Sequence, residues 1–188
     1  MNQWQKHLER TVGTILLDEQ MLAKRVSEMA QEITADYDAV HAEELVVIGI
    51  LRGSVVFMSD LIRQLQLPVV LDFMATSSYA KGTRSSGTVR ILKDISESIS
   101  DKHVLIVEDI IDSGLTLQCL KELLLARKPK SLKLCSLLDK PSRRTVELSA
   151  DYTGFTIPDE FVVGYGLDYN GHYRQLPYIG VLKPEAYK

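Results

Sequence analysis

The stretch VLIVEDIIDSGLTL, residues 104–117, brings together side chains that can bind phosphates, hydroxyl groups and metal ions. Its polar and glycine residues are Glu108, Asp109, Asp112, Ser113, Gly114 and Thr116. Carboxylates accept hydrogen bonds from hydroxyl groups and bind hard cations, whereas hydroxyl and backbone N–H groups at the start of a helix bind phosphate. The stretch therefore predicts a ligand that carries a phosphate together with hydroxyl groups or a divalent cation, such as a sugar phosphate or a diphosphate.

A simpler explanation is available for each of these residues alone. Asp112 and Ser113 are of types that often cap the first turn of a helix. That explanation is weaker for the whole group, because ligands of open α/β sheets bind outside the carboxyl ends of the strands. The apolar run before Glu108 predicts such a strand.

The elements around this stretch alternate between strands and helices. Apolar residues at helical spacing predict a helix over residues 18–40. A second helix follows Ser54, its predicted N-cap, and ends before Pro68, and a third ends at Arg127. Predicted strands cover residues 45–50, 69–79, 87–95, 103–110 and 132–140. The alternation predicts one α/β domain over residues 1–188, with a mostly parallel, twisted sheet flanked by helices.

The composition is that of an ordinary soluble protein, with 45% apolar and 25% charged residues and a net charge of −3. This charge gives no reason to expect a nucleic-acid partner. The first residues, MNQWQKHLER, predict no signal peptide, and no apolar run approaches the ~20 residues that span a bilayer. Cys119 and Cys135 lie in apolar runs and are expected to be buried thiols. Together these features predict a cytoplasmic protein without a membrane partner.

The segment SSYAKGTRSSG, residues 77–87, is small, polar and basic, and it separates two predicted strands. It is too long for a tight hairpin and has no apolar anchor, which indicates a mobile flap. A plain exposed hairpin loop is the alternative.

Residues 104–117 resemble the phosphoribosyl diphosphate-binding motif of type I phosphoribosyltransferases. That motif is a strand, two acids, two further residues and a loop rich in hydroxyl groups and glycine. Three further segments are similar to the corresponding segments of the hypoxanthine-guanine phosphoribosyltransferases: ILRGS, SLLDKPSRR and IPDEFVVGYGLDYNGHYRQLPYIG. The resemblance runs from about residue 45 onward, and Arg52 and Leu115 are similar to the residues of bacterial members. It implies the type I fold with a small hood and a mobile flap.

The resemblance also implies a reaction and an assembly. A 6-oxopurine, hypoxanthine or guanine, and 5-phosphoribosyl 1-diphosphate would give IMP or GMP and diphosphate, with Mg²⁺. The chain would act in purine salvage as a homodimer or homotetramer.

Roles for the central motif follow from the same resemblance. Glu108 and Asp109 would meet the ribose hydroxyl groups, directly or through the metal ion. Asp112 would exchange a proton with N7 of the base while N9 attacks the anomeric carbon. The 5′-phosphate would be held by Asp112, Ser113, Gly114, Leu115 and Thr116.

The diphosphate and the second metal ion have their own implied partners. Arg52 and Gly53 would contact diphosphate, in a loop that in this family often contains a cis peptide bond, here Leu51–Arg52. Arg174 would supply a second diphosphate contact, and Asp168 would help to hold a second metal ion. Taken alone, Arg52 could be a solvated turn residue. Some members have lysine at this position, and an arginine could change the diphosphate geometry.

The base would be recognised by three further residues. Lys140 would donate a hydrogen bond to O6 and reject adenine, because an ammonium group accepts no hydrogen bond. Phe161 would stack on the purine, and the backbone around Val162 and Asp168 would read the edge that carries the 2-substituent. Taken alone, Lys140 is more often a surface lysine and Phe161 a core aromatic.

Ser78 and Tyr79 match the Ser-Tyr pair of the family's mobile loop, whose closure would bind substrate and exclude water. Three alternatives to the implied function remain open at this point. They are a xanthine-preferring enzyme, an RNA-binding regulator of the same fold and a nucleotide-binding domain without turnover.

Overall fold

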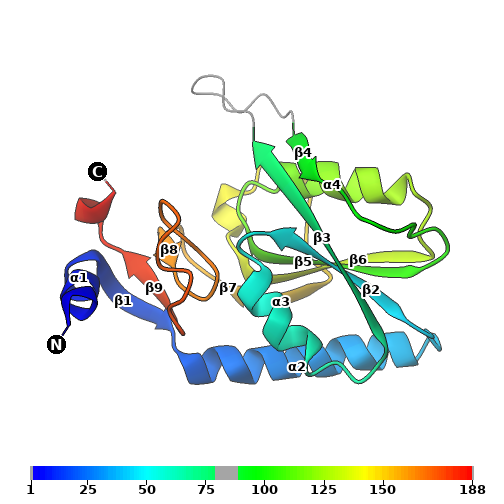
Figure 1. Cartoon of the computed structure of the whole chain (residues 1–188), viewed down its shortest axis with the longest axis horizontal. Coiled ribbons are helices and arrows are strands. Elements are labelled where there is room, and N and C mark those ends of the chain that lie inside the picture. Colours follow the sequence, from blue (N-terminus) through cyan, green and yellow to red (C-terminus); the bar gives the residue numbers. More distant parts are fainter. Residues whose placement is uncertain (1, 79–88, 188) are drawn as a thin grey trace.

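The computed structural model describes residues 2–78 and 89–187, with the side chains of Ser78 and Val89 left out. Within these residues, the larger sheet has the strand order β4, β3, β2, β5, β6, β7 (Figure 1). The strands are β2 (Leu45–Leu51), β3 (Val69–Ser78), β4 (Val89–Lys93), β5 (His103–Ile111), β6 (Ser131–Asp139) and β7 (Tyr152–Thr156). Only β3 and β4 pair antiparallel in this sheet, so the prediction of a mostly parallel α/β sheet is confirmed.

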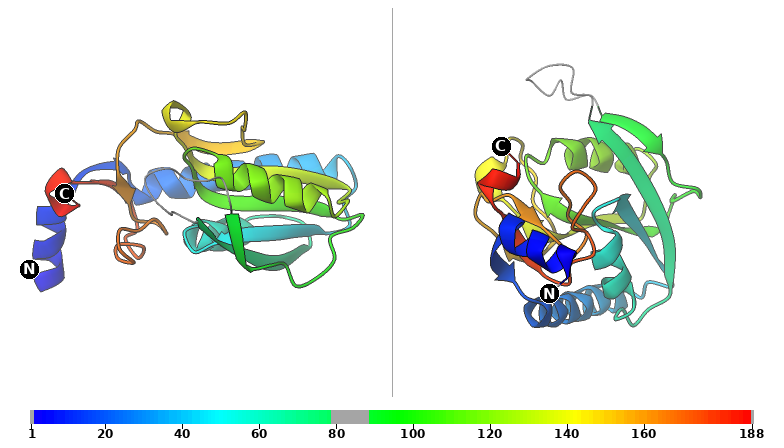
Figure 2. Two further views of the ribbon diagram at one scale, coloured as in Figure 1. Left: turned by 90° about the horizontal axis from the view of Figure 1, so that it is seen from above. Right: turned by 60° about the vertical axis from the view of Figure 1, so that its left-hand side comes forward.

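Helices cover both faces of this sheet (Figure 2). Val47 and Leu105 pack in one core with buried residues of α2 (Glu19–Asp38) and α3 (Val55–Ile62). Val46 and Val104, their neighbours in sequence, pack in a second core with α4 (Leu115–Leu125). Because successive strand residues point to opposite faces, a strand covered on both faces needs a continuous apolar run.

A small antiparallel sheet forms the hood that the sequence resemblance implies. Its strand order is β1 (Val12–Leu17), β9 (Ile179–Leu182) and β8 (Val162–Val163). It lies beside the larger sheet, together with α1 (Gln3–Thr11) and the two described ends of the chain (Figure 1). A Cβ added at Gly166 would come within 2.1 Å of the Gly53 carbonyl oxygen, so the chain between β8 and β9 lies directly against the loop that follows β2.

Several local predictions were wrong. Ser54 is the N-cap residue of α3 as predicted, but its hydroxyl donates to the Ile50 carbonyl (2.7 Å) and makes no capping hydrogen bond. That helix ends at Ile62, well before Pro68. Cys135 is buried, whereas Cys119 is only partly buried because it lies on a flank of α4. The sequence analysis also missed α1 and β1; α1 has no buried residues to mark it.

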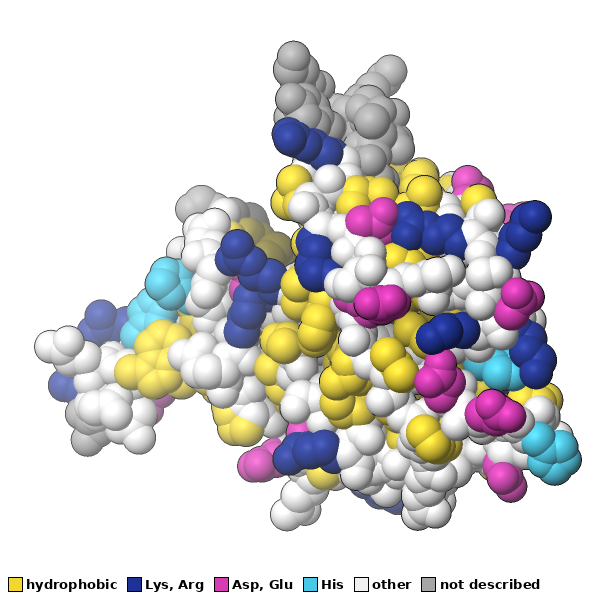
Figure 3. Space-filling model, turned by 45° about the vertical axis from the view of Figure 1, so that its right-hand side comes forward, with side chains coloured by type: hydrophobic (Ala, Val, Ile, Leu, Met, Phe, Trp, Pro, Cys, Tyr) yellow, Lys and Arg dark blue, Asp and Glu magenta, His cyan; other side chains and the backbone are white. Residues whose placement is uncertain are grey.

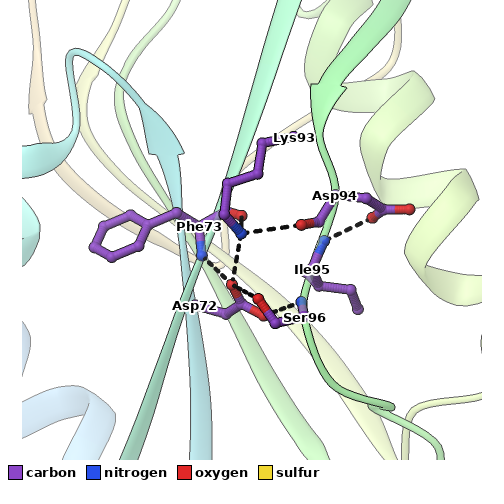
Figure 4. A network of polar contacts seen from close by, with 6 residues as sticks. All are labelled: Asp72, Phe73, Lys93, Asp94, Ile95 and Ser96. Carbon is purple, nitrogen blue, oxygen red and sulfur yellow. Dashed lines mark hydrogen bonds and ion pairs between the residues drawn. The ribbon is translucent and has the colours of Figure 1, made fainter.

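A polar network joins β3 to the chain that leaves β4 (Figure 4). The Asp72 carboxylate accepts hydrogen bonds from the backbone N–H groups of Phe73 (2.7 Å) and Ser96 (2.5 Å) and from Lys93 Nζ (3.0 Å). The Asp72 side chain is only 12% exposed, so the network fixes the base of the β3–β4 ribbon. The two strands end at Ser78 and begin at Val89 at the other end of this ribbon, and residues 79–87 of the predicted flap fall outside the described residues.

Apolar side chains gather on one face of the molecule, with charged side chains of both signs around them (Figure 3). The large apolar side chains that are exposed on α3 and β3 are Val55, Val70 and Leu71. Over the described ranges, no helix has both the length and the apolar character that a membrane crossing requires.

Candidate active site

The loop between β5 and α4 surrounds a cavity of about 260 Å³. Gly114, the residue before α4, has φ of 84°, in the left-handed region that favours glycine. A Cβ at this position would lie 2.9 Å from Val146 Cγ2. The cavity is lined by Glu108, Asp109, Ile110, Asp112, Ser113, Gly114, Thr116 and Leu117. The structure thus brings together the six residues with which the sequence analysis began; the backbone of Leu115 begins the helix.

Glu108 and Asp109 form an acidic pair at the end of β5. Burial raises the pKa of Glu108 well above its ordinary value, and the neighbouring charge of Asp109 raises it further. Asp109 also lies against the loop after β2, because a Cβ at Gly53 would come within 1.6 Å of Asp109 Oδ2. Only glycine fits at position 53, so this loop can approach the acidic pair closely.

The loop after β2 meets the chain between β8 and β9. The Leu51–Arg52 peptide bond is cis, as the resemblance implies, and Arg52 is exposed. Arg174 donates to the Gly166 carbonyl (2.5 Å) and pairs with Asp168 (Nη2 to Oδ1, 2.6 Å). The loop after β2 is therefore in contact both with the acidic pair and with the chain between β8 and β9. The first segment carries Gly53, and the second carries Asp168 and Arg174.

A second cavity, of about 450 Å³, adjoins the first. Its lining residues are Ile110, Asp112, Lys140, Arg143, Asp159, Glu160, Phe161, Val162, Leu167, Asp168 and Tyr187. Ile110 and Asp112 line both cavities. The Asp112 carboxylate pairs with Arg143 (Nε to Oδ1, 3.1 Å), so it stands at the junction of the two cavities.

The second cavity decides between the alternatives for Lys140 and Phe161. Lys140 is only 8% exposed and donates from Nζ to the Glu160 carbonyl (2.6 Å), so it is not a surface lysine. Phe161 is 40% exposed and lines the cavity, so it is not a core aromatic. Val162 is buried in β8 beside it.

Six residues that line this cavity were not predicted from the sequence: Ile110, Arg143, Asp159, Glu160, Leu167 and Tyr187. Ile110 and Arg143 lie inside the quoted motifs, so their position in the sequence could have identified them. Tyr187 had no such signal, yet its ring stacks on Phe161 with centroids 5.1 Å apart. Tyr169 meets the edge of the same ring at 5.7 Å.

The carboxylates fit a metal ion that takes part of its coordination from a ligand. Among the described residues, no three His, Cys, Asp or Glu side chains come together as a metal site. Glu108 and Asp109 line the first cavity and Asp168 the second. These are oxygen donors of the kind that Mg²⁺ prefers, and Mg²⁺ usually keeps waters or substrate phosphates as its other ligands.

The flap residues cannot be added to this geometry. Ser78 ends β3, but its side chain lies outside the described part of the chain, as does all of Tyr79.

The chain is similar to known proteins both in sequence and in fold. The family model described as "Phosphoribosyl transferase domain" matches residues 13–170. A hypoxanthine-guanine phosphoribosyltransferase of Bacillus subtilis is 48% identical over 181 residues, which are 96% of this chain and 99% of that protein. The bifunctional protein TilS/HprT of Listeria monocytogenes is 48% identical over 96% of this chain, which spans only 27% of that protein.

A crystal structure of a hypoxanthine phosphoribosyltransferase from Staphylococcus aureus superposes with a TM-score of 0.91 at 48% identity, covering 97% of each chain.

Proposed function

The chain belongs to the phosphoribosyl transferase family, and we propose that it transfers the phosphoribosyl group of 5-phosphoribosyl 1-diphosphate to hypoxanthine or guanine. The products are IMP or GMP and diphosphate, which makes the reaction a step of purine salvage. One observation carries this proposal: Asp112 lines both the cavity with the acidic pair and helix start and the cavity with Lys140 and Phe161. A group at this junction can act on a purine and a ribose that meet there.

The base occupies the second cavity. Phe161 stacks on the purine, a contact that the exposure of its ring supports. Lys140 donates to O6, and the backbone of Val162 and Asp168 reads the edge with the 2-substituent. An adenine amino group finds no acceptor on Lys140, which leaves a buried donor unpaired and disfavours adenine.

The phosphoribosyl group occupies the first cavity. Its 5′-phosphate receives hydrogen bonds from the N–H groups of residues 112–116 and from the hydroxyl groups of Ser113 and Thr116. The ribose hydroxyl groups donate to Glu108 and Asp109. Positive charge that develops on the ribose is stabilised by this acidic pair.

Asp112 acts as the general base. As N9 attacks the anomeric carbon, the carboxylate takes the proton from N7, which keeps the purine neutral. The same carboxylate returns the proton in the reverse direction.

The leaving diphosphate lies against Arg52, Gly53 and Arg174. Two cationic side chains and a backbone N–H group favour the negative charge that develops there. Glu108 and Asp109 would hold one Mg²⁺ ion and Asp168 would help to hold a second, each together with the substrate. When bound, these ions would neutralise part of the diphosphate charge. Ser78 and Tyr79 belong to a flap that closes over the site and excludes water.

A panel of bases tests this function. Diphosphate release is measured with 5-phosphoribosyl 1-diphosphate, Mg²⁺ and hypoxanthine, guanine, xanthine, adenine or uracil in parallel. Turnover with hypoxanthine or guanine and little with adenine is expected. Turnover with xanthine alone would show that xanthine, and not hypoxanthine or guanine, is the substrate. No turnover with any base would contradict the proposed activity.

The setting of the enzyme is also part of the proposal. The 188 residues form one domain that acts in the cytoplasm as a homodimer or homotetramer. Exposed apolar side chains of α3 and β3, among them Val55 and Leu71, support an assembly, because a second copy can cover them. Light scattering coupled to size exclusion gives the mass that decides this; a monomer at micromolar concentration would contradict it.

A further inference from the structure

The chain that leaves β6 lies directly behind the loop between β5 and α4. We name residues 140–146 the backing segment; it includes the short 3-10 helix Pro141–Arg143. Its first N–H group, that of Lys140, donates to the Ile111 carbonyl at 3.0 Å. It therefore begins beside the last residue of β5 and follows the loop from behind.

The backing segment donates hydrogen bonds to two successive carbonyl groups of the loop between β5 and α4. Arg144 Nη1 donates to the Asp112 carbonyl at 3.0 Å. The Thr145 N–H group donates to the Ser113 carbonyl at 3.0 Å, and the Thr145 hydroxyl donates to the same oxygen at 3.2 Å. Both carbonyl oxygens thus point toward the backing segment.

The direction of these carbonyls fixes the direction of two N–H groups. In a trans peptide unit the C=O and the N–H point in opposite directions. The Asp112 carbonyl belongs to the same unit as the Ser113 N–H, and the Ser113 carbonyl to the same unit as the Gly114 N–H. The two N–H groups therefore point away from the backing segment, toward the side of the loop that lines the first cavity.

Arg144 is itself held in place. Its guanidinium forms an ion pair with Asp139, the last residue of β6, and its side chain is only 14% exposed. A Cβ at Gly114 would come within 3.2 Å of Arg144 Cδ. The guanidinium thus lies between the end of β6 and the loop. Its planar group of donors can pair with the Asp139 carboxylate and donate to the Asp112 carbonyl at the same time.

We propose that Arg144 is a positioning residue for phosphate binding: by holding the Asp112 carbonyl, it aims the Ser113 and Gly114 N–H groups at the 5′-phosphate of the substrate. Thr145 assists it at the next carbonyl. This role rests on the proposed function, in which the loop binds a phosphate monoester. It goes further because neither residue touches the ligand.

The role predicts a loss that is specific to the phosphate group. Affinities of IMP and inosine are compared, since the two differ only by the 5′-phosphate, by competition against turnover. Arg144→Gln is expected to lower the affinity for IMP about tenfold or more, and to change the affinity for inosine by less than about twofold. Arg144→Lys is expected to recover part of the IMP affinity, because lysine can still donate to the carbonyl.

Two further variants keep the test decisive. Thr145→Val removes only the exposed hydroxyl group, so it leaves folding intact and is expected to weaken IMP about twofold to threefold. Arg127→Gln is the matched control, because Arg127 pairs with Asp94 (2.6 Å) away from both cavities. It is expected to leave the affinities of IMP and inosine unchanged. Melting temperatures are recorded for the wild-type protein and all four variants.

The outcomes separate this inference from the proposed function. If Arg144→Gln weakens IMP and inosine equally, or if it leaves IMP unchanged, Arg144 does not position the loop. If Arg144→Gln does not fold, an unchanged IMP affinity in Thr145→Val overturns the role of the backing segment. If the wild-type protein binds IMP no better than inosine, the loop binds no phosphate and the proposed function itself fails.

Discussion

At the scale of single residues, the proposed function gives Lys140 the choice of base. It is a buried ammonium group that, within the described residues, donates to the Glu160 carbonyl oxygen in the wall of its own cavity. We expect Lys140→Gln to lower kcat/KM for hypoxanthine about 10- to 100-fold, since a hydrogen bond to a charged donor contributes about 1.5–3 kcal/mol. Because an amide can also accept, discrimination against adenine should narrow.

Steady-state kinetics with both bases check this expectation. Lys24→Gln is the control, because Lys24 is 80% exposed on α2. Undiminished selectivity for hypoxanthine in Lys140→Gln would remove Lys140 from base recognition.

Gly114 shows how one backbone conformation supports the loop between β5 and α4, which binds the 5′-phosphate in the proposed function. Gly114→Ala places a Cβ in the left-handed region and against Val146, so we expect a loss of about 2–4 kcal/mol in the free energy of unfolding. Gly171→Ala is the matched control: Gly171 has φ of 81°, but nothing lies within 4 Å of an added Cβ. The free energy of unfolding of Gly171→Ala should fall by only about 1 kcal/mol. Equal losses in urea unfolding would show that the contact with Val146 is unimportant.

At the scale of elements, the Asp72 network ties β3 to the chain after β4 (Figure 4). Burial raises the pKa of Asp72, but hydrogen bonds from Ser96, Phe73 and Lys93 outweigh it, so the net pKa is lowered. A carboxyl group with a lowered folded-state pKa stabilises the fold above its unfolded pKa, roughly 3.9. That stabilisation is lost as the pH falls through the folded-state pKa.

We therefore expect Asp72→Asn to lower the free energy of unfolding by about 1–3 kcal/mol at pH 7. The difference from the wild-type protein should shrink below about pH 4. Urea unfolding over a pH series measures both effects. Asp38→Asn, at an exposed position near the end of α2, should change stability by less than about 0.5 kcal/mol. A constant difference at all pH values would contradict the ionic origin of the network's stability.

The elements also show what could be predicted from the sequence. The strands β2 and β5 were recognisable because burial on both faces imposes continuous apolar runs on them. The hood strands were not, because β8 has two residues and β1 pairs with β9, a partner at the far end of the chain. Short strands with distant partners leave no periodic signal.

At the scale of the whole molecule, the hood completes the site. The larger sheet supplies the acidic pair and the phosphate loop, and the chain around β8 supplies Phe161 and Val162. Motif resemblance predicted the residues of both parts. It did not predict Tyr187 or the contacts of Arg144 and Thr145 with the loop after β5, because these depend on segments that are distant in sequence.

In the proposed function, Asp112, at the junction of the two cavities, exchanges the proton of the base. The most direct measurement is the turnover of Asp112→Asn with hypoxanthine, together with its affinity for IMP. An amide keeps the shape but accepts no proton, so we expect kcat to fall about 10²- to 10⁴-fold while IMP affinity changes only a few-fold. Unchanged turnover in Asp112→Asn would contradict the account.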